Sequence, residues 1–313
     1  MASANPVRIG YVPEHYLLPL HLANRNSLFP FPVELTPCPS GTGQMISLLR
    51  EDKIDLAIGL TEGWVAGLLT PEGKQQRGYS IVGSWVENPL RWSIVTGKGR
   101  EELSSVKDLL EGGVAKGKVK VGVSRMGSGS HVMAFVLAQR EGWDTEKEVE
   151  FEVLGPFKEL RDGVNEGKAD FFMWEHFTTK GYWDQGVKKE LKWLGEIYTP
   201  WPSWCVTASE KRFPQPEGDE TLKGFFEAVD QGKKLFLEKQ DECVQLLGTR
   251  ELGCYYGEED AREWLKGAKF FEKTRGIDAT MVDDVVRVLK GAGVLGHDVQ
   301  RIDGDGTAGV KKA

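Results

Sequence analysis

The feature that most constrains the fold is a weak internal repeat. The segment R-I-G-Y-V-P-E-H (8–15) has a counterpart in K-V-G-V-S-R-M-G (120–127), since in both a short apolar run opens into a loop. Further along, L-L-R-E-D-K-I-D-L-A-I-G-L (48–60) resembles R-D-G-V-N-E-G-K-A-D-F-F-M (161–173), and both pass through a Lys-x-Asp turn into an apolar strand. The repeat predicts two lobes built on one plan.

Each half alternates strand, loop and helix, which is typical of a mostly parallel sheet flanked by helices. The length of 313 residues also exceeds what one hydrophobic core usually holds. We therefore expect an α/β fold of two lobes. Lobe 1 is expected to be discontinuous, comprising residues 1–94 and 199–313, and lobe 2 to comprise 95–198. Two aromatic, β-branched segments, 81–97 and 191–208, would be the hinge crossings between them.

Composition excludes several classes of protein. The net charge is -7, and no cluster of Lys and Arg is present that would favour a nucleic-acid partner. No run approaches the roughly 20 apolar residues that span a bilayer. The amino terminus lacks a basic segment followed by an apolar one, so the expected location is cytoplasmic unless a leader was removed. The four scattered cysteines indicate free thiols rather than a disulfide framework or metal site. The oligomeric state stays open.

The loop G-S-G-S-H (127–131) follows a short β-branched run and precedes an apolar stretch. It has no Lys for a nucleotide-triphosphate loop, a poor match to a dinucleotide fingerprint, and no G-x-S-x-G elbow. Backbone N–H groups at a helix start, with Ser128, Gly129, Ser130 and His131, would suit a sulfonate, phosphate, carboxylate or polar ring edge. The alternative is that a serine only caps the helix.

Comparable loops follow the other predicted strands, and ligands bind at the carboxyl ends of such strands in open parallel sheets. Every candidate also has a plain structural alternative: a packed aromatic ring, a solvated carboxylate, a structural histidine, or an arginine that braces the hinge. The candidates in these loops and in the first crossing are Pro13, Glu14, His15, Ser40, Gly41, Thr42, Thr61, Glu62, Trp64, Arg91, Trp174 and Glu175.

Three stretches carry a resemblance to a known family: S-G-T-G-Q-M-I-S-L-L-R-E-D-K-I-D-L-A-I-G, G-S-G-S-H-V-M-A and G-K-A-D-F-F-M-W-E-H-F. Over residues 6–290 the chain resembles type II periplasmic binding proteins of the sulfonate, nitrate and thiamine-precursor branch, and especially a leaderless fungal group. The resemblance implies two α/β lobes that close on a small ligand by a hinge.

The resemblance implies a binder of a small polar, anionic or zwitterionic metabolite, such as a sulfonate, an amino acid or an aminopyrimidine-like compound. No cofactor, metal or catalytic residue is expected. Trp64 and Trp174 would flank a ring, and Glu14, Glu62 or Glu175 would accept from an amino group. The alternative is a cofactor-poor enzyme of the same fold, a lyase or pyrimidine-precursor synthase, using a Glu/His pair. The cysteine-rich cluster of the fungal pyrimidine synthases is missing here.

Overall fold

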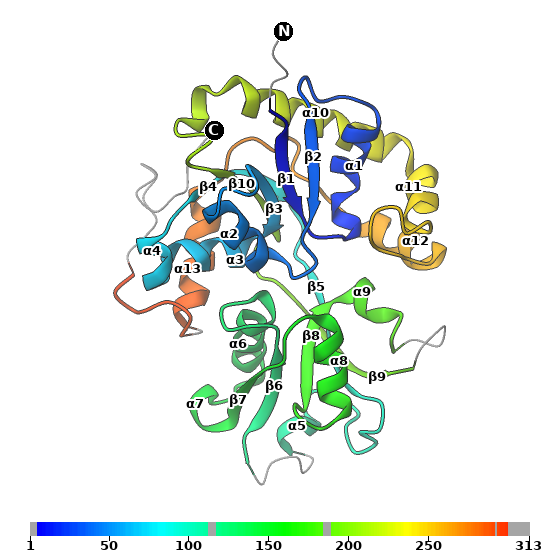
Figure 1. The fold of residues 1–313 in the computed structure, drawn as a ribbon. Helices are drawn as coiled ribbons and strands as arrows, with labels where there is room; N and C mark the ends of the chain where they lie inside the picture. The colour runs from blue at the N-terminus through cyan, green and yellow to red at the C-terminus, as the bar shows by residue number, and fades with distance from the viewer. Residues whose placement is uncertain (1–4, 112–116, 184–188, 292, 300–313) are drawn as a thin grey trace. The chain divides into compact units, whose positions relative to one another are not determined.

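The computed structural model describes residues 5–111, 117–183, 189–291 and 293–299. The chain divides into two compact units (Figure 1). Unit 1 comprises Met1–Asn88, Trp201–Arg287 and Leu295–Ala313, and unit 2 comprises Pro89–Pro200 and Val288–Val294. By this division the chain changes unit after residues 88, 200, 287 and 294, whereas the sequence predicted changes after 94 and 198 only.

Unit 1 is built on a five-stranded sheet with the order β2-β1-β3-β10-β4. Strands β1, β2 and β3 run parallel, and β10 runs antiparallel to both β3 and β4. The strands are β1 (Val7–Tyr11), β2 (Val33–Pro37), β3 (Leu56–Leu60), β4 (Tyr79–Val86) and β10 (Trp204–Ser209). The helices are η1 (His15–Leu17), α1 (Leu18–Arg25), α2 (Thr42–Arg50), α3 (Thr61–Leu69), α4 (Pro71–Gln75), η2 (Pro216–Gly218), α10 (Glu220–Glu238), α11 (Gln240–Leu247) and α12 (Glu258–Gly267); α13 (Ala279–Gly291) begins in this unit.

Unit 2 has a sheet with the corresponding order β7-β6-β8-β5-β9. Strand β6 is parallel to β7 and β8, and β5 is antiparallel to β8 and β9. The strands are β5 (Arg91–Gly97), β6 (Val119–Val123), β7 (Val149–Val153), β8 (Phe171–Glu175) and β9 (Leu191–Tyr198). The helices are α5 (Asp108–Glu111), α6 (Gly129–Glu141), α7 (Thr145–Glu148), α8 (Phe157–Asn165) and α9 (His176–Lys180).

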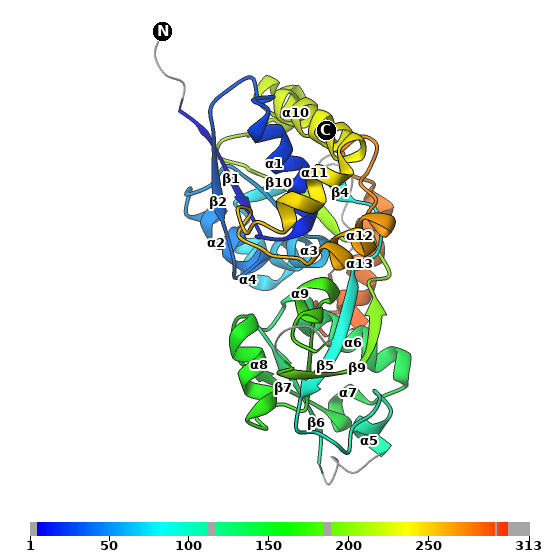
Figure 2. The same cartoon turned by 90° about the vertical axis from the view of Figure 1, so that its right-hand side faces the viewer.

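The hydrophobic pattern explains which elements form the core of each unit. Strand β4 is buried at every position and β3 at all but its last, as expected for strands covered on both faces. In unit 1, α1 packs against α10, and α2 packs against α3 and the sheet (Figures 1 and 2). In unit 2, α8 covers a core that includes Val95, Leu160 and Phe172. The two-lobed α/β fold expected from the sequence is confirmed.

The internal repeat corresponds to the same hydrogen-bonding pattern in both units. In unit 1 the Asp55 N–H donates to the carbonyl of Arg8 at 2.7 Å, and its carboxylate accepts from the Arg8 N–H at 2.9 Å. In unit 2 the Asp170 N–H donates to the carbonyl of Lys120 at 2.8 Å, and its carboxylate accepts from the Lys120 N–H at 2.8 Å. Each Lys-x-Asp turn thus fixes the start of one strand against its parallel neighbour.

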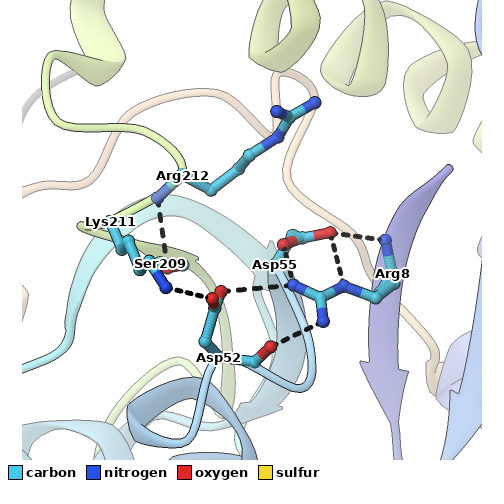
Figure 3. A network of polar contacts seen from close by, with 6 residues as sticks. All are labelled: Arg8, Asp52, Asp55, Ser209, Lys211 and Arg212. Carbon is cyan, nitrogen blue, oxygen red and sulfur yellow. Dashed lines mark hydrogen bonds and ion pairs between the residues drawn. The ribbon is translucent and has the colours of Figure 1, made fainter. Parts of the chain in front are cut away.

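An arginine completes each of these turns. In unit 1 the Arg8 guanidinium donates to Asp55 at 2.6 and 3.1 Å and to the Asp52 carbonyl at 2.6 Å (Figure 3). In unit 2 the guanidinium comes from Arg100, which donates to Asp170 at 3.1 Å. Because the two arginines come from different parts of the two halves, the aspartate is the shared element of the repeat.

Candidate functional site

Strand directions gather the candidate loops of unit 1 at one edge of its sheet. The carboxyl ends of β1, β2 and β3 lead into 12–15, 38–42 and 61–64. Because β10 is antiparallel, its first residue, Trp204, pairs with Leu60 at the end of β3 and with Val86 at the end of β4. The segment 201–203 therefore joins the same edge, which we call the strand-end edge of unit 1.

Unit 2 has a strand-end edge of the same kind. Strand β6 leads into 124–131, and β8 ends at Glu175. Trp92 of the antiparallel β5 pairs with Glu175, and Arg91 pairs with Tyr198 of β9. The expectation that candidate residues lie at strand ends is therefore met within each unit.

The start of α6 carries a small hydroxyl network. Ser128 is the N-cap, and its Oγ accepts from the His131 N–H at 3.3 Å. Ser130 Oγ accepts from the Ser124 N–H at 3.3 Å and lies 3.0 Å from Ser128 Oγ. The two hydroxyls hold two protons, and one of them makes the Ser128–Ser130 bond. The other proton has no acceptor among the described residues, so it is free to donate to a ligand.

The same helix start supplies further donors. The first backbone N–H groups of an α-helix have no intrahelical acceptor, and here they belong to Gly129 and Ser130. Their orientation and the helix dipole favour an anionic or strongly accepting group. Ser128 therefore caps α6, as the structural alternative expected, and the N–H groups of Gly129 and Ser130 still have no acceptor among the described residues.

His131 is held in its neutral form. Its Nδ1 accepts from the Gly127 N–H at 3.2 Å, which places the ring proton on Nε2. The ring packs edge to face against Phe135 and Phe151, with centroids 5.2 and 4.5 Å away. Burial lowers the pKa of His131 to about 4. His131 thus supports the loop as a packed, uncharged ring.

At the start of α2, Thr42 acts as a spacer between two helices. Its Oγ1 accepts from the Leu60 N–H at 3.0 Å, and a Cβ at Gly63 would lie 2.9 Å from its methyl group. Gly41, the N-cap, has a φ of 77°, which favours glycine. Ser40 is exposed, and its N–H donates to Gln44 Oε1 at 3.1 Å. The first turns of α2 and α3 therefore lie close together at the strand-end edge.

At the start of α3, Glu62 is buried without a charged partner. Its Oε2 accepts from Trp201 Nε1 at 3.0 Å, and its Oε1 has no hydrogen-bond partner among the described residues. Burial raises the pKa of Glu62 to about 7, although the bonds from its own N–H and from Trp201 oppose the rise. The neighbouring Thr61 hydroxyl donates to the carbonyl of Pro202 at 2.8 Å.

This buried carboxyl predicts a pH-dependent stability. The pKa of Glu62 is about 7 in the folded protein, compared with an ordinary value of 4.5. The stability that the protonated carboxyl group gives the folded protein is therefore complete below about pH 4.5 and is lost as the pH rises through 7. We expect the free energy of unfolding of the wild type, relative to Glu62→Gln, to fall by about 2–3 kcal/mol from pH 5 to pH 8.5. Urea unfolding at both pH values measures the difference, and parallel curves would contradict it.

Glu175 in unit 2 is also buried, but it caps a helix. Its oxygens accept from the Phe177 N–H at 3.1 Å and the Thr178 N–H at 2.7 Å. Burial raises the pKa of Glu175 to about 7, and these bonds oppose the rise. Its neighbour His176 shares a hydrogen bond of 3.0 Å with Ser93 Oγ. Glu175 is therefore the N-cap of α9.

Trp64 is a correction to the sequence-based interpretation. Its side chain has 0% exposure and packs edge to face against Tyr79, with centroids 5.3 Å apart. On α3 the residue after the first turn faces the sheet, where Gly59 leaves space for the indole. Trp64 is thus a core side chain of unit 1 in this structure.

Trp174 and Arg91 both have partners within unit 2. Trp174 is half-buried and packs against Phe157, with ring centroids 5.3 Å apart. The Arg91 guanidinium binds Glu196 of β9 at 2.7 and 2.8 Å. These two bonds join Arg91 of β5 to the neighbouring antiparallel strand β9.

The loop after β1 is packed rather than open. His15 lies in a cage of aromatic rings, with centroids 4.6 Å from Tyr16, 4.5 Å from Tyr256 and 4.6 Å from Trp264. Burial lowers the pKa of His15 well below its ordinary value. Glu14 is buried and Pro13 half-buried. His15 therefore stabilises unit 1 as a neutral ring.

Sequence analysis did not single out Trp201, Ser203 or Asn88. Ser203 Oγ donates to the carbonyl of Asn88 at 2.8 Å, and its own carbonyl accepts from the Thr61 N–H at 3.0 Å. These bonds join segments more than a hundred residues apart. Trp201 and Ser203 lie in the segment 191–208, which the sequence predicted as a crossing, but only the pairing of β10 brings this part of it beside Glu62.

Among the described residues, no group of three or more His, Cys, Asp or Glu side chains has the arrangement of a metal site. Over the same residues, no helix combines the length and the apolar character required to cross a bilayer.

Comparison with known proteins shows which family shares this architecture. A family model described as Ca3427-like PBP matches residues 92–197. A Candida albicans structure, "The conserved Candida albicans CA3427 gene product defines a new family of proteins exhibiting the generic periplasmic binding protein structural fold", is 33% identical, with a TM-score of 0.84 over 99% of this chain and 97% of that one. No match was found among curated proteins.

More distant structures share the fold. The alkanesulfonate-binding protein SsuA of Xanthomonas axonopodis pv. citri, bound to MOPS, is 14% identical with a TM-score of 0.75 over 100% of both chains. The periplasmic nitrate-binding protein NrtA of Synechocystis PCC 6803 is 16% identical with a TM-score of 0.70 over 94% of this chain and 83% of that one.

Two mixed five-stranded sheets flanked by helices give this chain the type II periplasmic-binding-protein fold. Within that class, the chain belongs to the Ca3427-like family, to which the identity of 33% over nearly the whole length assigns it.

Proposed function

We propose that this protein binds a small polar ligand that carries an anionic or strongly accepting group, and that this group sits at the start of α6. The observation that carries the proposal is the spare hydroxyl proton of the Ser128–Ser130 pair beside the first N–H groups of the helix. Similarity in fold to an alkanesulfonate-binding protein and a nitrate-binding protein supports an oxyanion as the bound group.

We further propose that the strand-end edge of unit 1 also takes part in ligand binding. Within unit 1, the first turn of α2 offers the backbone N–H group of Thr42, and the first turn of α3 offers the carboxyl group of Glu62. Donors with an acid group suit a sulfonate, amino acid or aminopyrimidine-like compound better than a dianion such as phosphate.

A thermal-shift panel tests the proposed function. It contains ethanesulfonate, MOPS, nitrate, amino acids, thiamine precursors and nucleobases. A ligand that binds only the folded protein raises the Tm in proportion to occupancy. A compound that raises the Tm and is recovered chemically unchanged indicates binding, whereas a compound recovered as a product indicates catalysis. If no member raises the Tm, the proposal is wrong.

The serine pair gives a sharper prediction. We expect Ser130→Ala to weaken the best ligand by about tenfold, because one donor to an anionic group contributes about 1.5 kcal/mol. Titration calorimetry measures the Kd. The control is Thr70→Ala, since Thr70 caps α4 by accepting from the Gly73 N–H at 3.3 Å and its loss affects a cap alone. Equal Kd values for wild type and Ser130→Ala would contradict the assignment.

A further inference from the structure

Glu62 differs from Glu175, another buried carboxyl group at a strand end. Glu175 uses its two oxygens to accept backbone N–H groups at the start of α9. Glu62 has one oxygen fixed by Trp201, whereas the other, Oε1, is buried with no hydrogen-bond partner among the described residues. A buried acceptor without a donor is unfavourable, so such groups in native proteins call for an explanation. Capping of a helix explains Glu175 and leaves Glu62 unexplained.

Within the described part of the chain, no charged side chain compensates Glu62. Helix α3 packs against α2, α4, β3 and β10. The titratable group nearby is Cys205 of β10, whose thiol lies 3.3 Å from Thr61 Oγ1. Burial raises the pKa of this thiol to about 12. The charged groups of α2 and α4 are Arg50, Glu72 and Lys74. They lie toward the other end of α3, where Arg50 donates to the Gly67 carbonyl at 2.8 Å.

The fold also fixes where Glu62 lies and how its carboxyl group is oriented. It follows β3 directly, in the first turn of α3, on the strand-end edge that also carries Thr42 and Thr61. The Trp201 indole, held in the second crossing, fixes Oε2 and so fixes where Oε1 points. The carboxyl group is thus oriented before any ligand arrives, which reduces the entropic cost of binding.

We infer that Glu62 contacts the ligand through Oε1, that it accepts from an ammonium or amidinium N–H group, and that this binding releases a proton from the carboxyl group to solvent. The inference rests on the proposed function and narrows it to ligands that carry a cationic nitrogen beside their anionic group. The balance is simple: the Glu62 O–H bond breaks, its proton passes to the buffer, and the ligand keeps its own protons.

Proton release makes the affinity depend on pH. A cationic ligand binds the ionised carboxylate, and burial sets the pKa of Glu62 near 7. The ionised fraction therefore rises about tenfold between pH 6 and pH 8, and the affinity for a cationic ligand should rise by the same factor. A matched ligand without the nitrogen should show no such gain.

The experiment uses two matched pairs of probes: taurine with ethanesulfonate, and β-alanine with propionate. Titration calorimetry at pH 6, 7 and 8, in buffers with different ionisation enthalpies, gives both the Kd and the number of protons released. We expect the amino member of a pair to bind more tightly at pH 8, with release approaching one proton at pH 6. We expect Glu62→Gln to lose about tenfold in affinity for it, with no pH dependence left, while the partner without nitrogen is unaffected. Glu72→Gln, on exposed α4, should match the wild type.

Trp201→Phe provides a second test that does not depend on the stability of the Glu62 variant. It keeps an aromatic ring but removes the donor that favours the ionised carboxyl group. The midpoint of the pH dependence should move upward, a change that a purely structural role would not produce.

The outcomes separate the two proposals. If Glu62→Gln leaves taurine affinity and proton release unchanged, or if ethanesulfonate binds as tightly as taurine at pH 8, the inference about Glu62 is wrong and the proposed function stands. If neither probe pair nor any other panel compound binds, both are wrong.

Discussion

Replacing Trp64 with alanine is expected to lower the free energy of unfolding by about 3–5 kcal/mol, as for other fully buried large side chains. The indole has 0% exposure and lies between Tyr79 and the Gly59 backbone, so its loss leaves a cavity in unit 1. Urea unfolding followed by circular dichroism measures the change. The loss would be large without any ligand present.

The matched control is Trp193→Ala, because Trp193 on β9 is 41% exposed. We expect that variant to lose less than about 1 kcal/mol. If Trp64→Ala instead kept its stability and lost ligand affinity, the indole would be a ligand contact, and the core placement of Trp64 would be wrong.

Replacing Asp55 with alanine is expected to cost about 2–4 kcal/mol, because it removes three hydrogen bonds to a buried carboxylate from a partly exposed arginine and leaves the Arg8 N–H without its acceptor. The carboxylate accepts from the Arg8 side chain twice and from the Arg8 N–H once (Figure 3). Its removal leaves the Arg8 N–H and guanidinium without these acceptors and releases the start of β3 from β1. Denaturant unfolding measures the change.

The repeat supplies a parallel test and a control. Asp170→Ala should have an effect of similar size in unit 2, since Asp170 accepts from the Lys120 N–H and from Arg100. Asp52→Asn should cost much less, because Asp52 sits at the exposed margin of the network with Lys211. Equal losses for Asp52→Asn and Asp55→Ala would show that surface charge, rather than the strand contact, holds the turn.

Much of the fold could be predicted from local patterns. The Lys-x-Asp turns recur because they have the same role in both halves. Each aspartate fixes the start of a strand beside its parallel neighbour through hydrogen bonds to one residue, Arg8 or Lys120. Strand ends were predicted from short apolar runs that open into Gly/Ser loops. Since parallel strands share a direction, the sequence also indicated which loops gather at one edge of each sheet.

The sequence was less informative where a side chain's position depends on its rotation about a helix axis or on pairing between distant strands. Trp64 lies two residues after Glu62, and at about 100° per residue that step turns a helical side chain from one face to another. The apolar run of α3 gives no sign of which side faces the sheet. Trp201 and Glu62 meet only because β10 runs antiparallel between β3 and β4, a strand order that local pattern does not reveal.

Hydrogen–deuterium exchange with and without saturating ligand tests the central claim most directly. The ligand is taurine, or the panel compound that raises the Tm most if taurine does not bind. The account predicts slower exchange at 127–131 in unit 2 and at 61–64 in unit 1, with no change at the Lys-x-Asp turns, 52–55 and 168–170, at the opposite sheet edges. Protection at those turns alone, or in neither strand-end loop, would contradict it.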